Sequence, residues 1–410
     1  MNTNEFIDKF TNQGYLSKEE IGYRLPNGLA LEEFWQEITK FRKQKSETLP
    51  FEDQNNQNFW FLLTPVLQKQ IYEIDSSGKD SLYRVVKKEI ENEIIKDSLI
   101  EEALYSSVIE GAFSTMKRLR ELVEKQRKPA DINDQMVLNN YQAMQFILLE
   151  KHKELSVDFV LQLHKIVTKE TLFEDEAYAG RFRDDSVYIK DKRRDVVIYT
   201  PPPADQVEPA IKKLIEWVNA KDDIHFIHPV IKASFIHFYF VYIHPFFDGN
   251  GRTARALFYY FLIKNGYEFF KYFSISAVVQ KTKIQYYKAI KNTEDNDADM
   301  TYFLLYMSET IQESIQLVTE RIAQHYQRDF VFIRIKENGI FLNERQEKFL
   351  KKFLVSDKRI ISIKAYKEWF KVVYETARRD LEDLASKEIL IKSKHRRQFM
   401  YSTNLNFKAN

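Results

Sequence analysis

The sequence contains no cysteine, which excludes disulfides, cysteine-ligated zinc, iron–sulfur clusters and thiol nucleophiles. Glycine and proline are scarce, at 10 each in 410 residues, so the chain is neither collagen-like nor dominated by linkers. An excess of one charge is also lacking, because 62 Lys and Arg against 60 Asp and Glu leave a net charge of +2. The whole molecule therefore has no field that would indicate nucleic acid or an anionic membrane, and any basic surface must be local.

Long hydrophobic runs are lacking as well. The longest stretch without a charged residue, 233–247, is too short to span a bilayer and contains two histidines. The opening residues MNTNEFIDKF carry acidic side chains and no apolar signal-peptide core. We therefore expect a cytoplasmic protein with no membrane partner. The chain does contain 44% hydrophobic and 14% aromatic residues over a length of two or three domains, which predicts globular domains with a sizeable core.

Apolar residues recur mostly three or four positions apart, which predicts a mainly α-helical fold. The expected helices cover residues 81–112, 135–150, 156–168, 205–219, 229–242, 252–265 and 300–326. One segment, 187–203, has two β-branched and aromatic runs around a charged turn, and it predicts a β-hairpin. We expect three parts, namely an N-terminal helical region at 1–113, a core at 114–335 and a separate module at 336–410.

The C-terminal module differs in charge, because residues 351–400 contain 14 Lys and Arg against 7 Asp and Glu. Three helix-like segments and two strand-like segments follow each other here in an order that resembles a winged helix-turn-helix. The residues that a DNA-binding module would use are Thr376, Arg378 and Arg379 at a recognition helix and Lys394, Arg396 and Arg397 on a basic wing. A winged helix that binds protein predicts the same sequence, so DNA and a protein partner both stay open.

The most informative segment is IHPFFDGNGRTAR, residues 243–255, which lies between two apolar helix patterns. Its glycines let the backbone approach a ligand closely, and the next helix is expected to start at about Gly251 or Arg252. A helix N-terminus with free N–H groups binds anions, and Arg252 and Arg255 lie three residues apart on its first turn. An anion site with two arginines predicts a polyphosphate ligand.

Two further residues of this segment carry chemistry. Asp248 lies at the mouth of the anion site and suits Mg²⁺, which prefers one or two carboxylates together with phosphates and water. His244, four residues earlier, is the nearby base whose ordinary pKa is close to neutrality, as general-base catalysis requires.

At this point a family resemblance enters. HPFFDGNGRTAR matches every specified position of the Fic-family signature His-Pro-Phe-x-Asp/Glu-Gly-Asn-Gly-Arg-x-x-Arg. Four other segments resemble family landmarks and occur in the order that the family has. They are EALYSSVIEGAF at 102–113, NNYQAM at 139–144, AGRFRDDSV at 179–187 and QYYKAI at 285–290. The resemblance covers about residues 80–330. It implies a Fic-type helical core whose small hairpin is a flap that docks a target segment by strand addition.

Members of the family that this chain resembles transfer AMP from ATP to a protein hydroxyl. The resemblance implies that His244 deprotonates the Ser, Thr or Tyr of a target protein and that Asp248 holds Mg²⁺. Arg252 would grip the β-phosphate of ATP and Arg255 the γ-phosphate. The full expected nucleotide site consists of Gly249, Asn250, Gly251, Arg252, Thr253, Ala254, Arg255 and Tyr287.

A second element of the site lies before the core, where Ser106 and Glu110 share a helix face at i, i+4 spacing. In the family, Ser/Thr-x-x-x-Glu-Gly/Asn marks an inhibitory helix whose Glu pairs with the second motif arginine, here Arg255. The chain resembles the subgroup that carries this helix N-terminally. We therefore expect an autoinhibited protein adenylyltransferase. The alternatives are hydrolytic removal of AMP by water that Glu110 activates, and an ATP-sensing DNA-binding regulator; a homodimer stays open.

Two other patterns are weaker. GNGRTA fits the relaxed dinucleotide fingerprint, with Glu268 near the acidic position, but that site needs a preceding strand. The histidine pairs His225 and His228, and His237 and His244, suggest a metal, yet no Glu or Cys completes a ligand set. We expect core or helix-capping histidines instead.

Overall fold

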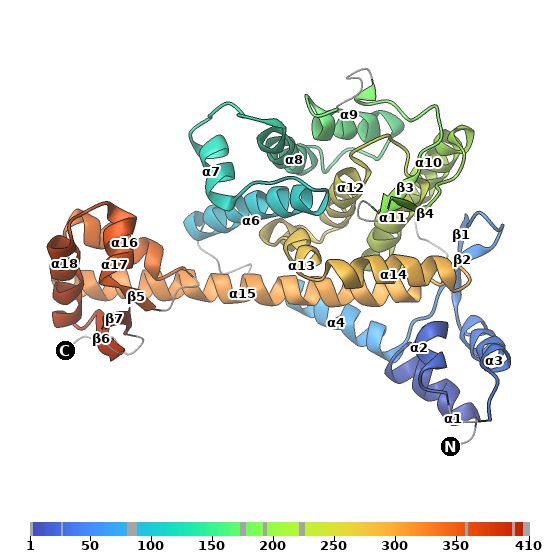
Figure 1. The fold of residues 1–410 in the computed structure, drawn as a ribbon, viewed down its shortest axis with the longest axis horizontal. Helices are drawn as coiled ribbons and strands as arrows, with labels where there is room; N and C mark the ends of the chain where they lie inside the picture. The colour runs from blue at the N-terminus through green and yellow to red at the C-terminus, as the bar shows by residue number, and fades with distance from the viewer. Residues whose placement is uncertain are drawn as a thin grey trace. The chain divides into compact units, whose positions relative to one another are not determined.

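The computed structural model describes residues 3–25, 28–79, 88–172, 178–191, 195–220, 226–356, 360–395 and 398–404. It divides into two compact units. The large unit comprises Met1–Arg84 and Ile95–Gln316, and the small unit comprises Val85–Ile94 and Leu317–Asn410. The fold is mainly helical (Figure 1), as the spacing of apolar residues predicts. In the described residues, no helix combines the length and the apolar character that crossing a membrane requires.

The described helices of the N-terminal part are α1 (Thr3–Asp8), the π-helix η1 (Lys9–Gln13), α2 (Lys18–Gly22), α3 (Leu31–Lys43), α4 (Pro65–Lys79) and α6 (Lys88–Ile109). The next are α7 (Met116–Glu124), α8 (Ile132–Leu149), α9 (Val157–Thr168), α10 (Ala204–Asn219), α11 (Pro229–Ile243) and α12 (Asn250–Lys264). They are followed by the 3-10 helix η3 (Glu268–Tyr272), α13 (Ile275–Lys281), α14 (Lys283–Asp295) and α15 (Thr301–Glu337). Residues of α6 and α15 belong to both units.

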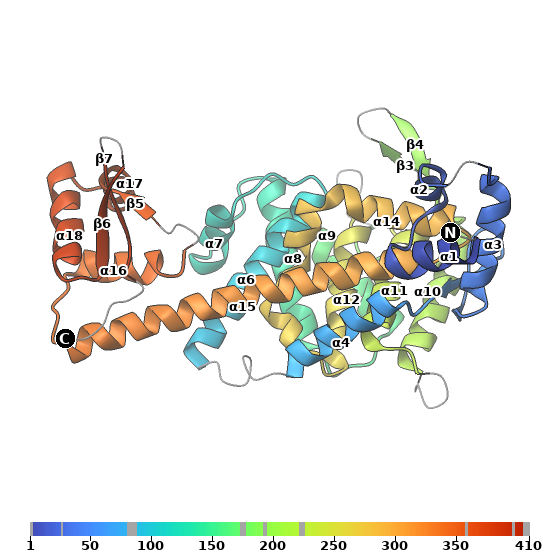
Figure 2. The ribbon, with the colours of Figure 1, turned by 90° about the horizontal axis from the view of Figure 1, so that it is seen from below.

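The centre of the large unit is the antiparallel pair α11 and α12, around which Figure 1 shows α8, α9 and α13. Almost every residue of both helices is buried. A helix that is apolar on all sides must be enclosed by protein, which explains why these two segments are so hydrophobic. Figure 2 shows α4 running alongside the beginning of α15, and Gln312 donates a hydrogen bond to Glu73 there at 2.5 Å. The loop between α11 and α12 therefore begins and ends on buried helices.

Two strands that the sequence analysis did not predict lie in the N-terminal region. β1 (Glu47–Glu52) and β2 (Asn58–Phe61) pair antiparallel around a polar turn. Phe51 and Phe59 pack on Phe235 of α11, with ring centroids 5.0 Å and 5.9 Å apart. The strands are short and one contains a proline, so their alternation is weak in the sequence, and packing against α11 stabilises them.

The hairpin predicted at 187–203 is present. β3 (Ile189–Asp191) and β4 (Val196–Tyr199) pair antiparallel, and the intervening residues 192–194 lie outside the described residues. Val196 and Ile198 are exposed by 55% and 62%. The hairpin thus presents an apolar strand to the outside of the large unit.

The small unit contains α16 (Glu344–Phe353), α17 (Ile363–Phe370) and α18 (Tyr374–Ser386) around a three-stranded antiparallel sheet. The strands β5 (Ile360–Ser362), β6 (Leu390–His395) and β7 (Gln398–Thr403) lie in the order β5-β7-β6. The predicted strand-like pair corresponds to β6 and β7, whereas β5 was not predicted. Arg396 and Arg397 of the predicted wing lie outside the described residues.

Candidate active site

The motif forms the sharp connection between α11 and α12. α11 ends at Ile243, and His244 adopts the left-handed conformation with φ = 52°. Gly249 has φ = 79°, and a Cβ atom added to it would lie 2.8 Å from Cγ2 of Thr168. Only glycine fits there without strain. The chain therefore reverses within six residues, between the end of α11 and the start of α12.

The side chain of Asn250 closes this loop. Its Oδ1 accepts a hydrogen bond from the backbone N–H of Phe246 at 2.9 Å, and its Nδ2 donates to the carbonyl of Phe246 at 2.7 Å. Phe246 is fully buried and stacks on His164, with ring centroids 3.5 Å apart. The amide of Asn250 is thus used to shape the loop, so any contact of Asn250 with a ligand would come from its backbone.

Two residues that the sequence analysis did not single out also hold the loop. The N–H of Gly180 donates to Nδ1 of His164 at 3.0 Å, which leaves Nε2 of His164 to donate to the carbonyl of Asp248 at 2.9 Å. Burial lowers the pKa of His164 to about 4, so the ring is neutral. Arg183 donates from Nε to the carbonyl of His244 at 2.8 Å. The landmark AGRFRDDSV contains Gly180 and Arg183, but only the fold shows what they contact.

His244 has the geometry of a base. Its Nδ1 lies 3.3 Å from the carbonyl of Val241, and donation from Nδ1 to that carbonyl leaves a lone pair on Nε2. Burial lowers the pKa of His244 from its ordinary value, although the hydrogen bond to Val241 and the charge of Glu110 act in the opposite direction. The imidazole is therefore neutral, and able to accept a proton, at neutral pH.

Arg252 and Asp248 form an ion pair at the start of α12. Arg252 is fully buried, and its Nη2 donates to Oδ2 of Asp248 at 3.0 Å. The Asp248 side chain is 54% exposed, at the mouth of the loop. The next residues, Thr253 and Ala254, have no exposed side chain. Of the predicted nucleotide-site residues, these two would contact a ligand only through their backbone.

Arg255 bonds to the predicted inhibitory helix through its Nε and Nη2 atoms. Its Nε donates to Oγ of Ser106 at 2.7 Å. Its Nη2 donates to the carbonyl of Ser106 at 2.8 Å and to Oε1 of Glu110 at 2.7 Å. The structure thus brings together the three residues that the sequence analysis connected, across 145 positions of the chain in the case of Glu110 and Arg255.

The carboxylate of Glu110 lies on the first turn of α12. A Cβ atom added to Gly251 would be only 2.1 Å from Oε1 of Glu110, so the carboxylate touches the bare backbone of that turn. Burial acts to raise the pKa of Glu110, but the charges of Arg255, Arg252 and Lys283 outweigh it and lower the pKa. Glu110 therefore lies, as an anion, against the start of α12, where the helix dipole favours negative charge.

α14 borders the site from another side. Tyr286 is buried, and its hydroxyl lies 2.9 Å from Nε2 of His237, so it belongs to the core. Tyr287, the predicted nucleotide contact, is 48% exposed, and both burial and the charge of Glu110 raise its pKa. Lys283 donates from Nζ to the carbonyl of Ile109 at 2.7 Å, a contact that the sequence analysis missed. α14 thus holds the end of α6 next to Glu110.

The weaker patterns have structural explanations. His237 is buried in the core, and His228 accepts a hydrogen bond from the N–H of Val230 at the start of α11; His225 lies outside the described residues. Within the described ranges, no group of three or more His, Asp or Glu side chains could hold a metal ion. Glu268 pairs with Lys151, and the residues before GNGRTA form a helix rather than the strand that a dinucleotide site requires.

Comparison with known proteins identifies the class of this site. Residues 154–262, which include α9, α11, most of α12 and the loop, match the sequence model of the Fic/DOC family. This segment is therefore similar to Fic/DOC domains, as its motif predicts.

The relatives are protein adenylyltransferases. Protein adenylyltransferase Fic of Nematostella vectensis is 30% identical over 179 residues, covering 42% of this chain and 39% of the relative. Protein adenylyltransferase fic-1 of Caenorhabditis elegans is 29% identical over 170 residues, covering 42% of this chain and 30% of the relative. The matches thus span about two fifths or less of the length of these relatives.

Solved structures share the fold. A Fic family protein from Desulfovibrio desulfuricans G20 superimposes with a TM-score of 0.54 at 18% identity, covering 85% of this chain and 98% of the other. Fic-1 from C. elegans gives a TM-score of 0.55 at 19% identity, covering 75% and 81%. These similarities extend the Fic fold beyond the matched segment.

Proposed function

We propose that the chain is an autoinhibited protein adenylyltransferase that transfers AMP from Mg²⁺-ATP to a Ser, Thr or Tyr hydroxyl of a target protein, or to itself. The observation that carries the proposal is the carboxylate of Glu110, which lies on the anion-binding turn of α12 and pairs with Arg255. The similarity to protein adenylyltransferases supports the reaction. This chain also has the expected residue at every specified position of the Fic signature.

In this reaction, His244 takes the proton of the acceptor hydroxyl at Nε2, the hydroxyl oxygen bonds to the α-phosphorus, and pyrophosphate leaves. The free N–H groups at the start of α12 and the guanidinium of Arg252 stabilise the phosphate charge, which makes positioning and electrostatics the main contributions of the protein. Asp248 would hold Mg²⁺, which neutralises phosphate charge when bound. A single half-exposed carboxylate beside a phosphate site fits this ion.

Autoinhibition follows from competition for one place. The first turn of α12 accepts either the carboxylate of Glu110 or a phosphate, because Glu110 already touches Gly251. Arg255 donates two hydrogen bonds to Ser106 and one to Glu110, so its Nε and Nη2 are engaged while Glu110 is in place. ATP must therefore displace Glu110 or bind with its phosphates misaligned.

The flap supplies a place for the target. β4 carries the exposed side chains of Val196 and Ile198 on a two-stranded sheet with open edges. An extended target segment can add to such an edge through backbone hydrogen bonds. Its hydroxyl would then be presented to His244.

The direct test is incubation with α-labelled ATP and Mg²⁺, followed by detection of label on protein. We expect weak labelling by the wild-type chain, strong labelling by Glu110→Gly, and none by Glu110→Gly combined with His244→Ala. Mass spectrometry of a co-incubated lysate would identify the target. Absence of labelling in a folded Glu110→Gly protein would contradict the proposal.

A second function is favoured by one observation, namely the position of the Glu110 carboxylate against Gly251 at the start of α12. A carboxylate at this position could accept a proton from water, so Glu110 could support hydrolytic removal of AMP from a modified protein. The two functions make opposite predictions. Glu110→Gly should increase AMP transfer under the first and abolish AMP removal from a pre-modified protein under the second.

For the small unit we propose a winged helix that binds a protein rather than DNA. Its elements follow in the order α16, β5, α17, α18, β6, β7, and α18 would be the recognition helix. Arg378 pairs within α18 with Glu375 at 2.6 Å and with Glu382 at 3.1 Å. The helix contains four acidic residues against two arginines, a net charge of −2, which opposes DNA phosphates. This also weakens the alternative of an ATP-sensing DNA-binding regulator.

A further inference from the structure

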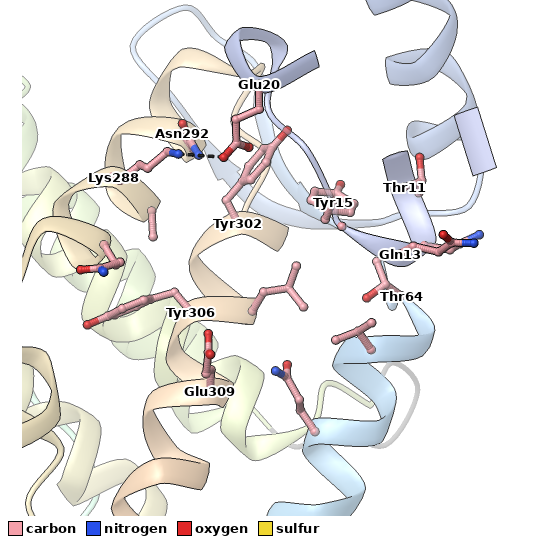
Figure 3. Close-up of a pocket in the computed structure, with 17 residues that line it drawn as sticks. Thr11, Gln13, Tyr15, Glu20, Thr64, Lys288, Asn292, Tyr302, Tyr306 and Glu309 are labelled. Atoms are coloured by element: carbon pink, nitrogen blue, oxygen red, sulfur yellow. Dashed lines mark hydrogen bonds and ion pairs between the residues drawn. The ribbon is translucent and has the colours of Figure 1, made fainter. Parts of the chain in front are cut away.

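A cavity lies in the large unit (Figure 3). Its volume is about 440 Å³, within the range of pockets that bind ligands. The walls come from four segments that are distant in sequence: residues 11–20, the beginning of α4, α14 and α15. No residue of the motif belongs to its lining.

The cavity combines aromatic surface with amide side chains. The hydroxyl of Tyr15 donates to Asp299 at 2.6 Å, and the hydroxyl of Tyr306 lies 2.9 Å from Oγ1 of Thr282. Because these hydroxyls already have partners, the tyrosines offer mainly their apolar rings. The amide side chains that line the cavity are Asn12, Gln13, Gln70, Gln285 and Asn292. Amides both donate and accept hydrogen bonds, as peptide groups require.

The charge of the lining is negative. Its ionisable residues are Glu20, Lys288 and Glu309, which sum to −1. Lys288 is already used, because its Nζ lies 2.7 Å from Oε1 of Glu20, the contact that Figure 3 marks. Glu309 has no ion-pair partner in the described part of the chain. A phosphate or carboxylate ligand would find no free cation here, whereas a basic ligand would find a free carboxylate.

We propose that this cavity binds a basic peptide segment. The stem of an arginine or lysine side chain packs against Tyr306 and Leu305, and its charge lies near Glu309. The peptide groups on either side bond to the lining amides.

The cavity is connected to the inhibitory helix through α14. Gln285, Lys288 and Asn292 line the cavity from one face of α14, while Lys283 donates to the carbonyl of Ile109. Thr282, which precedes Lys283, contacts the cavity wall through Tyr306. If displacement of Glu110 moves α14, the cavity changes shape, and a peptide that fits the present shape then favours the inhibited arrangement. This regulatory step rests on the proposed function, whereas the binding step does not.

Binding is tested by calorimetry on the full chain with acetyl-Gly-Arg-Gly-amide, which has no hydroxyl side chain. The same peptide with citrulline is the matched neutral ligand. We expect the arginine peptide to bind at least about threefold tighter, the scale of a partly exposed ion pair. Glu309→Gln should remove this preference, and the control Glu313→Gln, one turn further along α15, should keep it. Gln285→Trp, at an exposed position, should fill the mouth and weaken binding by more than about tenfold.

Absence of binding, equal binding of the two peptides, or equal effects of Glu309→Gln and Glu313→Gln would overturn the peptide site. Regulation is tested separately with α-labelled ATP. The arginine peptide at saturation should lower transfer by the wild-type chain at least about fivefold and leave Glu110→Gly unaffected. Binding without an effect on transfer overturns the regulatory step. If the peptide binds but no variant of the chain transfers AMP, the proposed function and the regulatory step are both overturned. The peptide site itself is then supported.

Discussion

Removal of the Glu110 side chain should release AMP transfer. In Glu110→Gly, the 2.7 Å hydrogen bond to Arg255 is lost and the carboxylate leaves the turn at Gly251. The backbone tolerates the change, because Glu110 already lies in the turn after α6 and its N–H bonds to the carbonyl of Ser107. The first turn of α12 and one donor of Arg255 then become available to ATP.

The expected magnitude follows from the burial of the pair. Arg255 is 4% exposed and Glu110 31% exposed. Truncating one member of a buried charge pair typically changes interaction energies by about 2 to 5 kcal/mol, and 2 kcal/mol corresponds to about thirtyfold. Because the Glu110 side is partly screened by solvent, we expect at least a tenfold increase in transfer.

The assay measures initial rates with α-labelled ATP at saturating Mg²⁺-ATP, including labelling of the chain itself. Glu110→Gln keeps the size of the side chain and removes its charge, so its rate should lie between those of the wild type and Glu110→Gly. Circular dichroism establishes that each variant is folded. An unchanged rate in folded Glu110→Gly would refute autoinhibition by this helix.

The remaining predictions concern the base, the metal and the small unit. His244→Ala should reduce transfer by about 10² to 10⁴-fold while ATP still binds, and more than a few per cent of residual transfer would contradict the role of the base. Because burial lowers the pKa of His244, the ring stays neutral to lower pH than the ring of an ordinary histidine. As the pH is lowered, the transfer rate should therefore fall only below about pH 6.5. A rate that already falls above this pH would argue against the buried environment. Asp248→Ala should impair transfer that depends on Mg²⁺, and equal wild-type activity with and without divalent metal would refute the metal role. At low salt, duplex DNA should either not bind or bind equally well after charge reversal at Arg378 and Arg379. Salt-dependent binding that is lost on charge reversal would instead establish a DNA interface.

Some elements of the structure could be predicted from the spacing of residues along the chain, and others could not. The long helices were predictable because apolar residues repeat with the helical period over many turns. The two N-terminal strands were not, because β1 and β2 are short and owe their stability to α11. The pairing of Arg378 with Glu375 and Glu382 lay within reach of the sequence, since the spacings are i, i+3 and i, i+4.

The sequence by itself was enough to predict an anion site at the loop, because residues 244–255 are contiguous and the free N–H groups of a helix N-terminus favour anions. It did not determine what supports the loop. His164 and Arg183 contact the loop across 84 and 61 positions of the chain. Tyr287, rather than Tyr286, is exposed because of how α14 rotates against the core. Such contacts depend on which side chains meet after the helices pack, and helical periodicity specifies a face but not its neighbour.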